Sequence, residues 1–220
     1  LRKRFPKAEI DVLATSRNKD VYYKDKNINR IFSLKLNPFY ILKFILLNIK
    51  KYDLVIDMEE YLNISAIISF FVGKKIVGYS HNSRAKLYTK KIRYNDKQHA
   101  VQTFLDLARA LNIDYNTDEL PMLNFSAKDK KSVDSFLRVN GIKDNLVVCV
   151  SPGAAESAKA RMWQFDRYAE LCDEIIERHN AKIIFVGALN EAELIGSIQK
   201  NMDNKDKAIN SAGKIKLNQL

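Results

Sequence analysis

The chain has 220 residues, of which 46% are hydrophobic and 29% charged, and its formal net charge at pH 7 is +11. A chain of this length and apolar content can bury one large core or two modest ones, which excludes a wholly disordered protein. The positive charge is concentrated in residues 1–100, which carry 21 Lys and Arg against 9 Asp and Glu, while residues 101–220 carry 16 against 17. This excess indicates an acidic partner for the first half: a nucleic acid, an anionic membrane surface or a phosphorylated substrate.

Strand and helix patterns alternate along the chain. Short runs rich in Val and Ile predict strands at 9–14, 30–34, 53–57, 75–78, 146–150 and 182–187. Apolar residues recur at spacings of three and four in two segments expected to be helical, 101–111 and 168–176, and a polar helix pattern spans 126–140. This alternation predicts mostly parallel strands with right-handed crossovers, so the fold class is α/β.

The most apolar segment, 39–49, is too short to span a bilayer and is interrupted by Lys43. We expect it to pack on the sheet as a crossover helix; the alternative is an amphipathic helix lying in a membrane interface. Cys149 and Cys172 fall in apolar runs and are predicted to be reduced core residues. The histidines are too scattered to predict a metal site; they are His81, His99 and His179.

The alternation breaks between residues 114 and 121 and resumes at Leu146. We therefore expect an N-terminal domain over 1–121, a linker and helix over 122–145, and a C-terminal domain over 146–220. The first residues read as the last turn of a helix stopped by Pro6. In a doubly wound sheet the first strand is central. We therefore expect the chain, which lacks this strand, to be a piece of a longer enzyme.

Residues 146–163 are the most informative segment. A buried strand runs into a turn at 151–155 and then towards a helix, an arrangement that presents backbone N–H groups and a positive helix end to a phosphate. Gly153 permits close backbone approach, and Arg161 can pair with phosphate oxygens. From the residues alone, an ordinary loop in which Trp163 fills the core remains an equal alternative.

A second segment repeats the pattern over residues 182–191. Its strand meets a turn at Gly187, and the acidic Glu191 follows at the start of a helix. A carboxylate at the carboxyl end of a strand can accept hydrogen bonds from ribose hydroxyls. The alternative is that Glu191 only complements the positive end of the helix.

Landmarks in both halves resemble glycosyltransferase family 9, the ADP-heptose:lipopolysaccharide heptosyltransferase family, in order and in approximate spacing. In the second half they are Pro152-Gly153-Ala154, Arg161-Met162-Trp163, Tyr168-Ala169-Glu170-Leu171, Val186-Gly187 with Glu191, and Ala212-Gly213-Lys214. In the first half they are the segments 1–13, 52–57, 77–79 and 99–107. The resemblance covers essentially the whole chain.

The resemblance implies a GT-B fold, in which two Rossmann-like domains with parallel sheets face each other across a cleft, both incomplete in this chain. It implies inverting transfer of a heptose or similar sugar from an ADP-sugar to a lipopolysaccharide core or related acidic, phosphorylated glycolipid, without a metal or other cofactor. The N-terminal domain would bind the acceptor and the C-terminal domain the nucleotide-sugar. The enzyme would be cytoplasmic and peripheral to the inner face of the cytoplasmic membrane, with no nucleic-acid partner.

The family's pattern also assigns roles to residues. The donor set would be Ser151, Gly153, Ala154, Ala155, Trp163, Gly187 and Glu191, with Glu191 near the ribose. Arg161 would neutralise the diphosphate leaving group, and Lys159 is the alternative for that role. Acceptor contacts are expected at Glu59, Asn82, Arg84 and His99. The family's catalytic aspartate, the general base, would lie upstream of Leu1 and its Asp-Thr-Gly-Pro-x-His loop downstream of Leu220, so we expect this chain alone to be inactive.

Two other functions remain open. A dinucleotide-dependent Rossmann oxidoreductase needs Gly-x-Gly-x-x-Gly after a strand, and this sequence contains no such run. A nucleic-acid-binding module is indicated by residues 79–94, where basic and aromatic residues alternate. The same segment can instead form a cationic rim for a phosphorylated lipid, or an ordinary lysine-rich surface.

Overall fold

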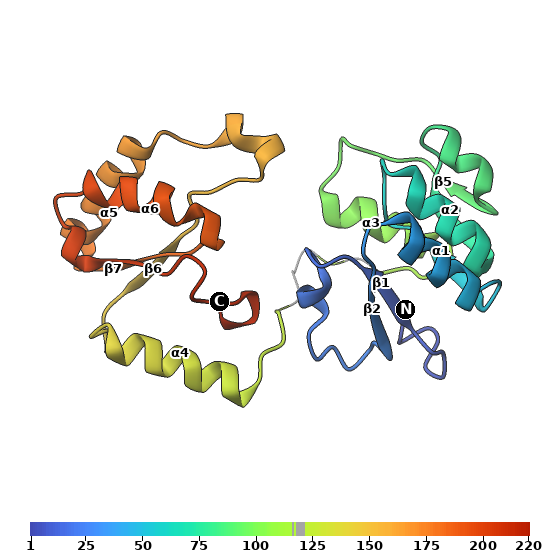
Figure 1. Cartoon of the computed structure of the whole chain (residues 1–220), viewed down its shortest axis with the longest axis horizontal. Helices are drawn as coiled ribbons and strands as arrows, with labels where there is room; N and C mark the ends of the chain where they lie inside the picture. The colour runs from blue at the N-terminus through green and yellow to red at the C-terminus, as the bar shows by residue number, and fades with distance from the viewer. Residues whose placement is uncertain (116, 118–121) are drawn as a thin grey trace. The chain divides into compact units, whose positions relative to one another are not determined.

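The computed structural model describes residues 1–115, 117 and 122–220 (Figure 1). It divides into two compact units, Leu1–Leu123 and Asn124–Leu220, which are described separately below. The division falls at the start of the segment expected to be a linker, and the helix within that segment belongs to the second unit.

Unit 1 alternates strands and helices in chain order. They are β1 (Asp11–Ala14), β2 (Arg30–Ser33), α1 (Pro38–Leu47), β3 (Tyr52–Ile56), α2 (Asn63–Val72), β4 (Gly73–Tyr79), β5 (Lys90–Ile92) and α3 (Ala100–Arg109). All strand pairs are parallel and form two sheets, β1-β2 and β3-β4-β5. The Tyr52 hydroxyl, at the start of β3, donates to Asp11 Oδ2 at the start of β1 across 3.1 Å.

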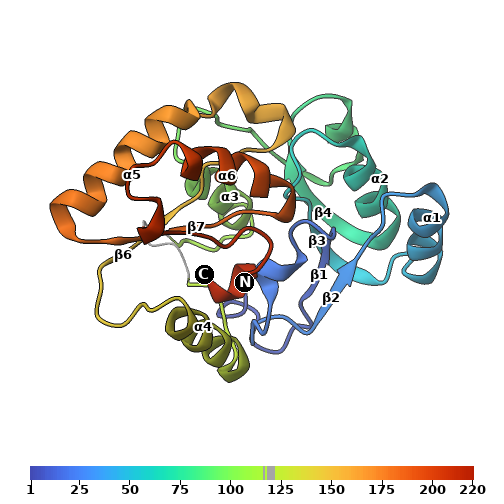
Figure 2. The ribbon, with the colours of Figure 1, turned by 60° about the vertical axis from the view of Figure 1, so that its left-hand side comes forward.

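Helices cover the strands of unit 1 on two faces (Figure 2). Alternate residues of β3 define these faces, because successive side chains of a strand point in opposite directions. Val55 packs with the α1 and α2 side of the core, which contains Ile45 and Ile68. Leu54 and Ile56 contact the other side, centred on Val77, Tyr79 and Leu107 of α3.

Unit 2 repeats the architecture. Its elements are α4 (Ala127–Val139), β6 (Val147–Val150), α5 (Phe165–His179), β7 (Lys182–Phe185), α6 (Ala192–Lys200) and β8 (Ala208–Asn210). The parallel sheet has the order β6-β7-β8, with Val150 paired to Phe185 and Phe185 to Asn210. Ile183 and Phe185 pack with side chains of α5 and α6, while Ile184 and Val186 pack with those of α4; Figures 1 and 2 show these helices.

Local capping explains where two of the predicted helices begin and end. The Ser126 side chain accepts from the Asp129 N–H while Asp129 accepts from the Ser126 N–H, which fixes the start of α4. α5 ends at Asn180, whose φ of 48° places it in the left-handed conformation that Asn tolerates at a helix end. The first cap coincides with the predicted start of the helix over 126–140, whereas α5 extends beyond the predicted 168–176 at both ends.

The six predicted strands and four predicted helices, including the one over 39–49, are confirmed. Two strands of three residues, β5 and β8, were not predicted, because each carries too short an apolar run to stand out. The prediction that both cysteines lie in the core is confirmed for Cys172 and wrong for Cys149. Cys172 is buried, and burial raises the pKa of its thiol to about 11, whereas Cys149 is exposed on β6.

Candidate functional site

Three turns of unit 2 meet at the carboxyl ends of β6, β7 and β8. Backbone hydrogen bonds hold them in register. The Val186 N–H donates to the Val150 carbonyl (2.9 Å), the Ser211 N–H to the Phe185 carbonyl (3.0 Å) and the Gly213 N–H to the Gly187 carbonyl (2.9 Å). The predicted donor-site turns at 151–155 and 187–191 are therefore neighbours, and the turn at 211–214 lies beside the second of them.

Glu191 connects the first two turns. Its Oε2 accepts a hydrogen bond of 2.6 Å from the Ala188 N–H. A Cβ built on Gly153 would lie 1.7 Å from Glu191 Oε1, and one built on Gly187 would lie 2.6 Å from Oε2. Both glycines are needed because the carboxylate occupies the space that any side chain at these positions would fill. The structure thus brings together three of the residues assigned to the donor set.

The third turn closes against the second in the same manner. Gly213 has a φ of +71°, and its absent Cβ would meet Leu189 Cβ at 2.9 Å. Lys214 Nζ donates to the Asn210 carbonyl across 3.1 Å, so this lysine is held at the end of β8. Each of the three strands is therefore followed by a turn in which a glycine lets the backbone lie close to a neighbouring residue, Glu191 or Leu189.

The position of Glu191 bears on its two possible roles. Glu191 is the N-cap residue of α6, yet its carboxylate makes no capping hydrogen bond to that helix. It bonds instead to Ala188 at the start of a single 3-10 turn, η4 (Leu189–Glu191). The carboxylate is turned towards the ends of β6 and β7, beside Gly153 and Gly187.

The segment from 151 to 164 differs from the sequence-based expectation in one respect. A 3-10 helix, η3 (Glu156–Arg161), lies between the turn and α5, which begins at Phe165. The positive end of α5 therefore does not follow the turn directly. The backbone donors available at the turn itself are those of residues 153–155, and Pro152 beneath them is buried.

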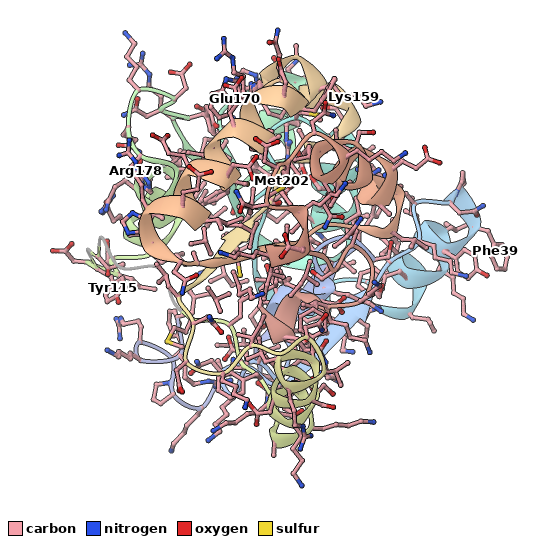
Figure 3. The ribbon with its side chains drawn as sticks, turned by 90° about the vertical axis from the view of Figure 1, so that its left-hand side faces the viewer. Phe39, Tyr115, Lys159, Glu170, Arg178 and Met202 are labelled. Carbon is pink, nitrogen blue, oxygen red and sulfur yellow. The ribbon has the colours of Figure 1, made fainter. Side chains whose placement is uncertain are left out.

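The remaining donor-set side chains lie around this segment. Ser151 and Ala155 are exposed and Ala154 is half-buried. Arg161 and Lys159 are both exposed in the last turn of η3, with Lys159 labelled in Figure 3. Trp163 is 51% exposed and meets Tyr168 edge-on, with ring centroids 5.5 Å apart, so it does not fill the core.

In unit 1, three of the predicted acceptor residues have local structural contacts. Glu59 Oε1 accepts from the N–H groups of residues 60, 61 and 62 and so fixes the loop before α2. Asn82 has a φ of 59° at the start of η2 (Ser83–Leu87). His99 Nδ1 accepts from the Val101 N–H at 3.3 Å and caps α3.

Arg84, the fourth predicted acceptor residue, is not on the surface. Its side chain is fully buried, and Nη2 pairs with Asp57 Oδ2 at 3.0 Å and with the Tyr88 hydroxyl at 2.7 Å. The Tyr88 hydroxyl donates to Asp57 Oδ2 at 2.7 Å, and burial, followed by this hydrogen bond, raises the pKa of Tyr88. Asp57 also accepts from the Ser65 hydroxyl at 3.0 Å. Arg84 therefore stabilises the end of β3 from within.

Four residues that sequence reasoning did not assign gather beside this network. Tyr61 and His81 meet edge-on with ring centroids 6.1 Å apart, and the His81 and Tyr94 rings lie 6.3 Å apart. A hydrogen bond with Glu60, followed by burial, raises the pKa of Tyr94 to about 12. Within the described residues, Glu60 Oε2 is a buried oxygen that has no hydrogen-bond partner. These residues come from loops after three different strands, a grouping that only the topology reveals.

The alternation of basic and aromatic residues over 79–94 does not form a surface for stacking bases. Tyr79 and Tyr88 are buried, and the Tyr79 hydroxyl donates to the Thr103 carbonyl at 3.1 Å. Lys90 donates to the Ala110 carbonyl. The aromatic rings therefore pack inward, whereas single-stranded nucleic acids are bound by exposed rings.

Within the described parts of the chain, no helix is long and apolar enough to cross a membrane. The same residues contain no group of three His, Cys, Asp or Glu side chains placed to hold a metal ion.

Comparison with known proteins gives consistent results. The sequence pattern described as glycosyltransferase family 9 (heptosyltransferase) matches residues 46–220. A glycosyl transferase family 9 structure from Veillonella parvula superposes with a TM-score of 0.83 at 18% identity, covering 99% of this chain and 64% of that one. No curated protein sequence matches the chain.

Two Escherichia coli structures are also similar. ADP-heptose lps heptosyltransferase II has a TM-score of 0.74 at 19% identity, covering 99% of this chain and 67% of that one. Heptosyltransferase WaaC with ADP-2-deoxy-2-fluoro heptose has a TM-score of 0.63 at 15% identity, covering 94% and 68%. The chain thus spans about two thirds of the length of these structures, and the likeness establishes the GT-B fold.

Proposed function

Because the chain belongs to glycosyltransferase family 9, we propose that it is part of an inverting glycosyltransferase that transfers a heptose or similar sugar from an ADP-sugar. The acceptor is a lipopolysaccharide core or a related phosphorylated glycolipid. The protein works in the cytoplasm at the inner face of the cytoplasmic membrane, without a metal or other cofactor.

One observation carries the donor half of this proposal: the Glu191 carboxylate lies against Gly153 and Gly187 at the ends of two adjacent parallel strands. Ligands of α/β sheets bind outside the carboxyl ends of the strands, and an acid there accepts hydrogen bonds from ribose hydroxyls. The E. coli WaaC structure named above holds an ADP-heptose analogue. Glu191 is accordingly assigned to the ribose and the 153–155 backbone to the diphosphate.

Arg161 is assigned to the leaving group. Transfer of the sugar breaks the bond between its anomeric carbon and the diphosphate, and negative charge grows on the departing oxygen. A guanidinium placed at that oxygen stabilises the transition state more than the ground state, which lowers the barrier. Arg161 is exposed at the end of η3, six residues after the turn at 151–155, so its long side chain can reach a bound diphosphate.

The acceptor is assigned to unit 1, whose excess of Lys and Arg suits a phosphorylated glycolipid. We assign the general base to no carboxylate of the network at β3. Asp57 is already engaged by Arg84, Tyr88 and Ser65, and Glu59 by three backbone N–H groups.

Titration of the chain with ADP and with NAD, followed by calorimetry, tests the donor assignment. We expect saturable binding of ADP, weaker binding of NAD, and loss of ADP affinity by about tenfold in Glu191→Ala, since a lost ribose contact is a hydrogen bond to a charged group. Binding of NAD in preference to ADP would overturn the assignment in favour of an oxidoreductase.

The role of Arg161 is tested by turnover in an active preparation of the protein. Arg161→Ala should lower kcat by about a hundredfold or more, the usual effect of removing one group that stabilises transition-state charge. Lys159→Ala is the matched control, because it removes a second exposed cation from the same 3-10 helix. Near-normal turnover in both variants would refute the assignment, and loss in Lys159→Ala alone would transfer the role to Lys159.

A further inference from the structure

Helix α1 is apolar on both of its faces. The inward face packs against the α2 side of the core through Ile41, Phe44 and Ile45. The outward face exposes Phe39 (69%), Leu42 (55%), Leu46 (60%) and Leu47 (70%). A surface helix of a globular protein normally has a polar outer face, so a helix that is apolar all round and yet exposed needs a further partner.

The exposed apolar surface continues beyond α1. Ile49, which follows the helix, is 55% exposed, and the Lys50 N–H donates to the Phe71 carbonyl at 2.9 Å, which joins this segment to the end of α2. Phe70 and Phe71 are 41% and 43% exposed there. Figure 3 shows the Phe39 side chain at the outer edge of α1, directed away from the ribbon.

The charge of this surface is entirely positive. Residues 26–52 contain no Asp or Glu, while Lys35, Lys43, Lys50 and Lys51 lie in or beside α1. Lys43 stands four residues after Phe39 and three before Leu46, so it shares their face of the helix. It is exposed, and no carboxylate among the described residues pairs with it. The surface therefore combines apolar side chains with unneutralised cations.

This combination distinguishes between possible occupants. A second copy of the chain, related by a two-fold axis, would place one lysine-bearing α1 against another with no acid between them. An anionic lipid layer instead accepts apolar side chains among its acyl chains and pairs lysines with headgroup phosphates. The outward face protrudes as single side chains from a helix, a shape that a deformable lipid layer accommodates.

We propose that the outward face of α1 is a membrane-docking surface that inserts Phe39, Leu42 and Leu46 into an anionic bilayer while Lys43 contacts headgroup phosphates. The inference specifies a surface for the membrane association included in the proposed function. It depends on the proposed function only for the identity of the membrane that is bound. The same helix thus serves as a crossover helix on its inner face and as an interfacial helix on its outer face.

Vesicle sedimentation tests the proposal with the whole chain, using vesicles of phosphatidylcholine alone and vesicles in which part of it is replaced by phosphatidylglycerol. We expect binding to the anionic vesicles and little to the neutral ones. Lys43→Glu, and separately Phe39→Ser with Leu46→Ser, should each weaken anionic binding by about tenfold or more. The substituted side chains are exposed, so thermal unfolding should be unchanged.

Matched controls come from α4 in unit 2. Val139 is 80% exposed and Lys131 is exposed, so Val139→Ser and Lys131→Glu change the same properties elsewhere and should leave binding within about twofold, the tolerance for weak surface contacts. A Phe39→Trp reporter in a Trp163→Phe background should show a blue-shifted emission that brominated lipids quench. It reports insertion directly.

Four results would overturn the proposal: no binding of the wild-type chain to anionic vesicles, equal binding to neutral ones, equal losses in the α1 and α4 variants, or a dimer that the α1 variants dissociate. The vesicles contain no sugar acceptor or nucleotide. Failure of docking is therefore distinguishable from failure of the proposed transfer reaction, which the ADP titration tests without lipid.

Discussion

The two units use different means at the same place, the carboxyl end of a parallel sheet. In unit 2 the strand ends meet through glycines, and one carboxylate, Glu191, sits in the space left by two absent side chains. In unit 1 the end of β3 is filled by a buried ion pair, Asp57 with Arg84, which Tyr88 and Ser65 complete.

Because of this difference, we expect the site in unit 1 to contribute mainly to the free energy of unfolding and the site in unit 2 mainly to ligand binding. The buried charges at the end of β3 in unit 1 pair with each other, so their removal should affect unfolding more than ligand binding. The half-buried carboxylate of unit 2 has one oxygen engaged by Ala188, and its other contacts are steric. Its disturbance should affect binding more than unfolding.

The largest effect is expected when the buried pair of unit 1 is broken. Arg84→Met leaves the Asp57 carboxylate, of which only 4% of the side chain is exposed, without its cation. The free energy of unfolding should fall by about 3–5 kcal/mol, the usual effect of leaving one buried charge uncompensated. Urea unfolding measures this change.

Lys74→Met is the matched control, because it breaks the exposed pair with Asp53, whose atoms lie 2.8 Å apart. Exposed pairs are screened by water, so stability should hardly change. Replacing both Arg84 by Met and Asp57 by Leu should recover part of the loss. Equal stability of Arg84→Met and Lys74→Met would contradict the structural role of the buried pair.

A smaller effect on stability, with a clear effect on binding, is expected at the glycine contact of unit 2. In Gly153→Ala the new methyl group takes the place of Glu191 Oε1, so the carboxylate must leave and lose its bond to Ala188. Unfolding should become easier by about 1 kcal/mol, the net worth of one hydrogen bond. ADP affinity should fall as it does in Glu191→Ala.

The double variant Gly153→Ala with Glu191→Ala sharpens this prediction. Once the carboxylate is gone, the methyl group has space, so the double variant should be as stable as Glu191→Ala alone. Additive losses measured by thermal unfolding would mean that Gly153 is required for a reason other than Glu191.

The smallest effect concerns alkaline pH. Burial, followed by the hydrogen bond to Asp11, raises the pKa of Tyr52 to about 12. The unfolded side chain titrates near 10, so the folded state holds its proton more tightly. The corresponding stability is complete below pH 10 and is lost as the pH rises towards 12.

Tyr52→Phe should therefore flatten the dependence of unfolding free energy on pH between about 10 and 12. Tyr40→Phe is the control, because no hydrogen bond to the Tyr40 hydroxyl occurs among the described residues. The same slope in wild type and Tyr52→Phe would contradict the prediction.

The sequence predicted those elements whose pattern lies within their own residues, and it missed those that depend on contacts with distant residues. Strands such as 146–150 and 182–187 are predicted by their continuous apolar runs, and the helix over 126–140 by its polar helix pattern. β5 and β8 have three residues each, and pairing with a longer neighbour, not their own pattern, makes them strands. Cys149 looks like a core residue because alternation alone does not reveal which face of β6 is covered.

The site was predicted in its parts but not in its contacts. Gly153, Gly187 and Glu191 were each singled out by their place after a strand, yet the sequence does not say that the carboxylate touches both glycines. That contact follows from the adjacency of β6 and β7. The burial of Arg84 was missed for a similar reason. Its neighbours Lys86 and Ser83 suggest a surface, while its partner Asp57 lies on another loop.

The packing of Glu191 against Gly153 has a consequence for how this protein can vary among its relatives. Because a side chain at 153 displaces the carboxylate of an acid at 191 from its position, a change at one position weakens the arrangement unless the other changes too. Substitutions at the two positions should therefore occur in pairs along lineages, with glycine at 153 wherever a glutamate stands at 191. Two residues 38 positions apart in the chain would then be inherited as one unit.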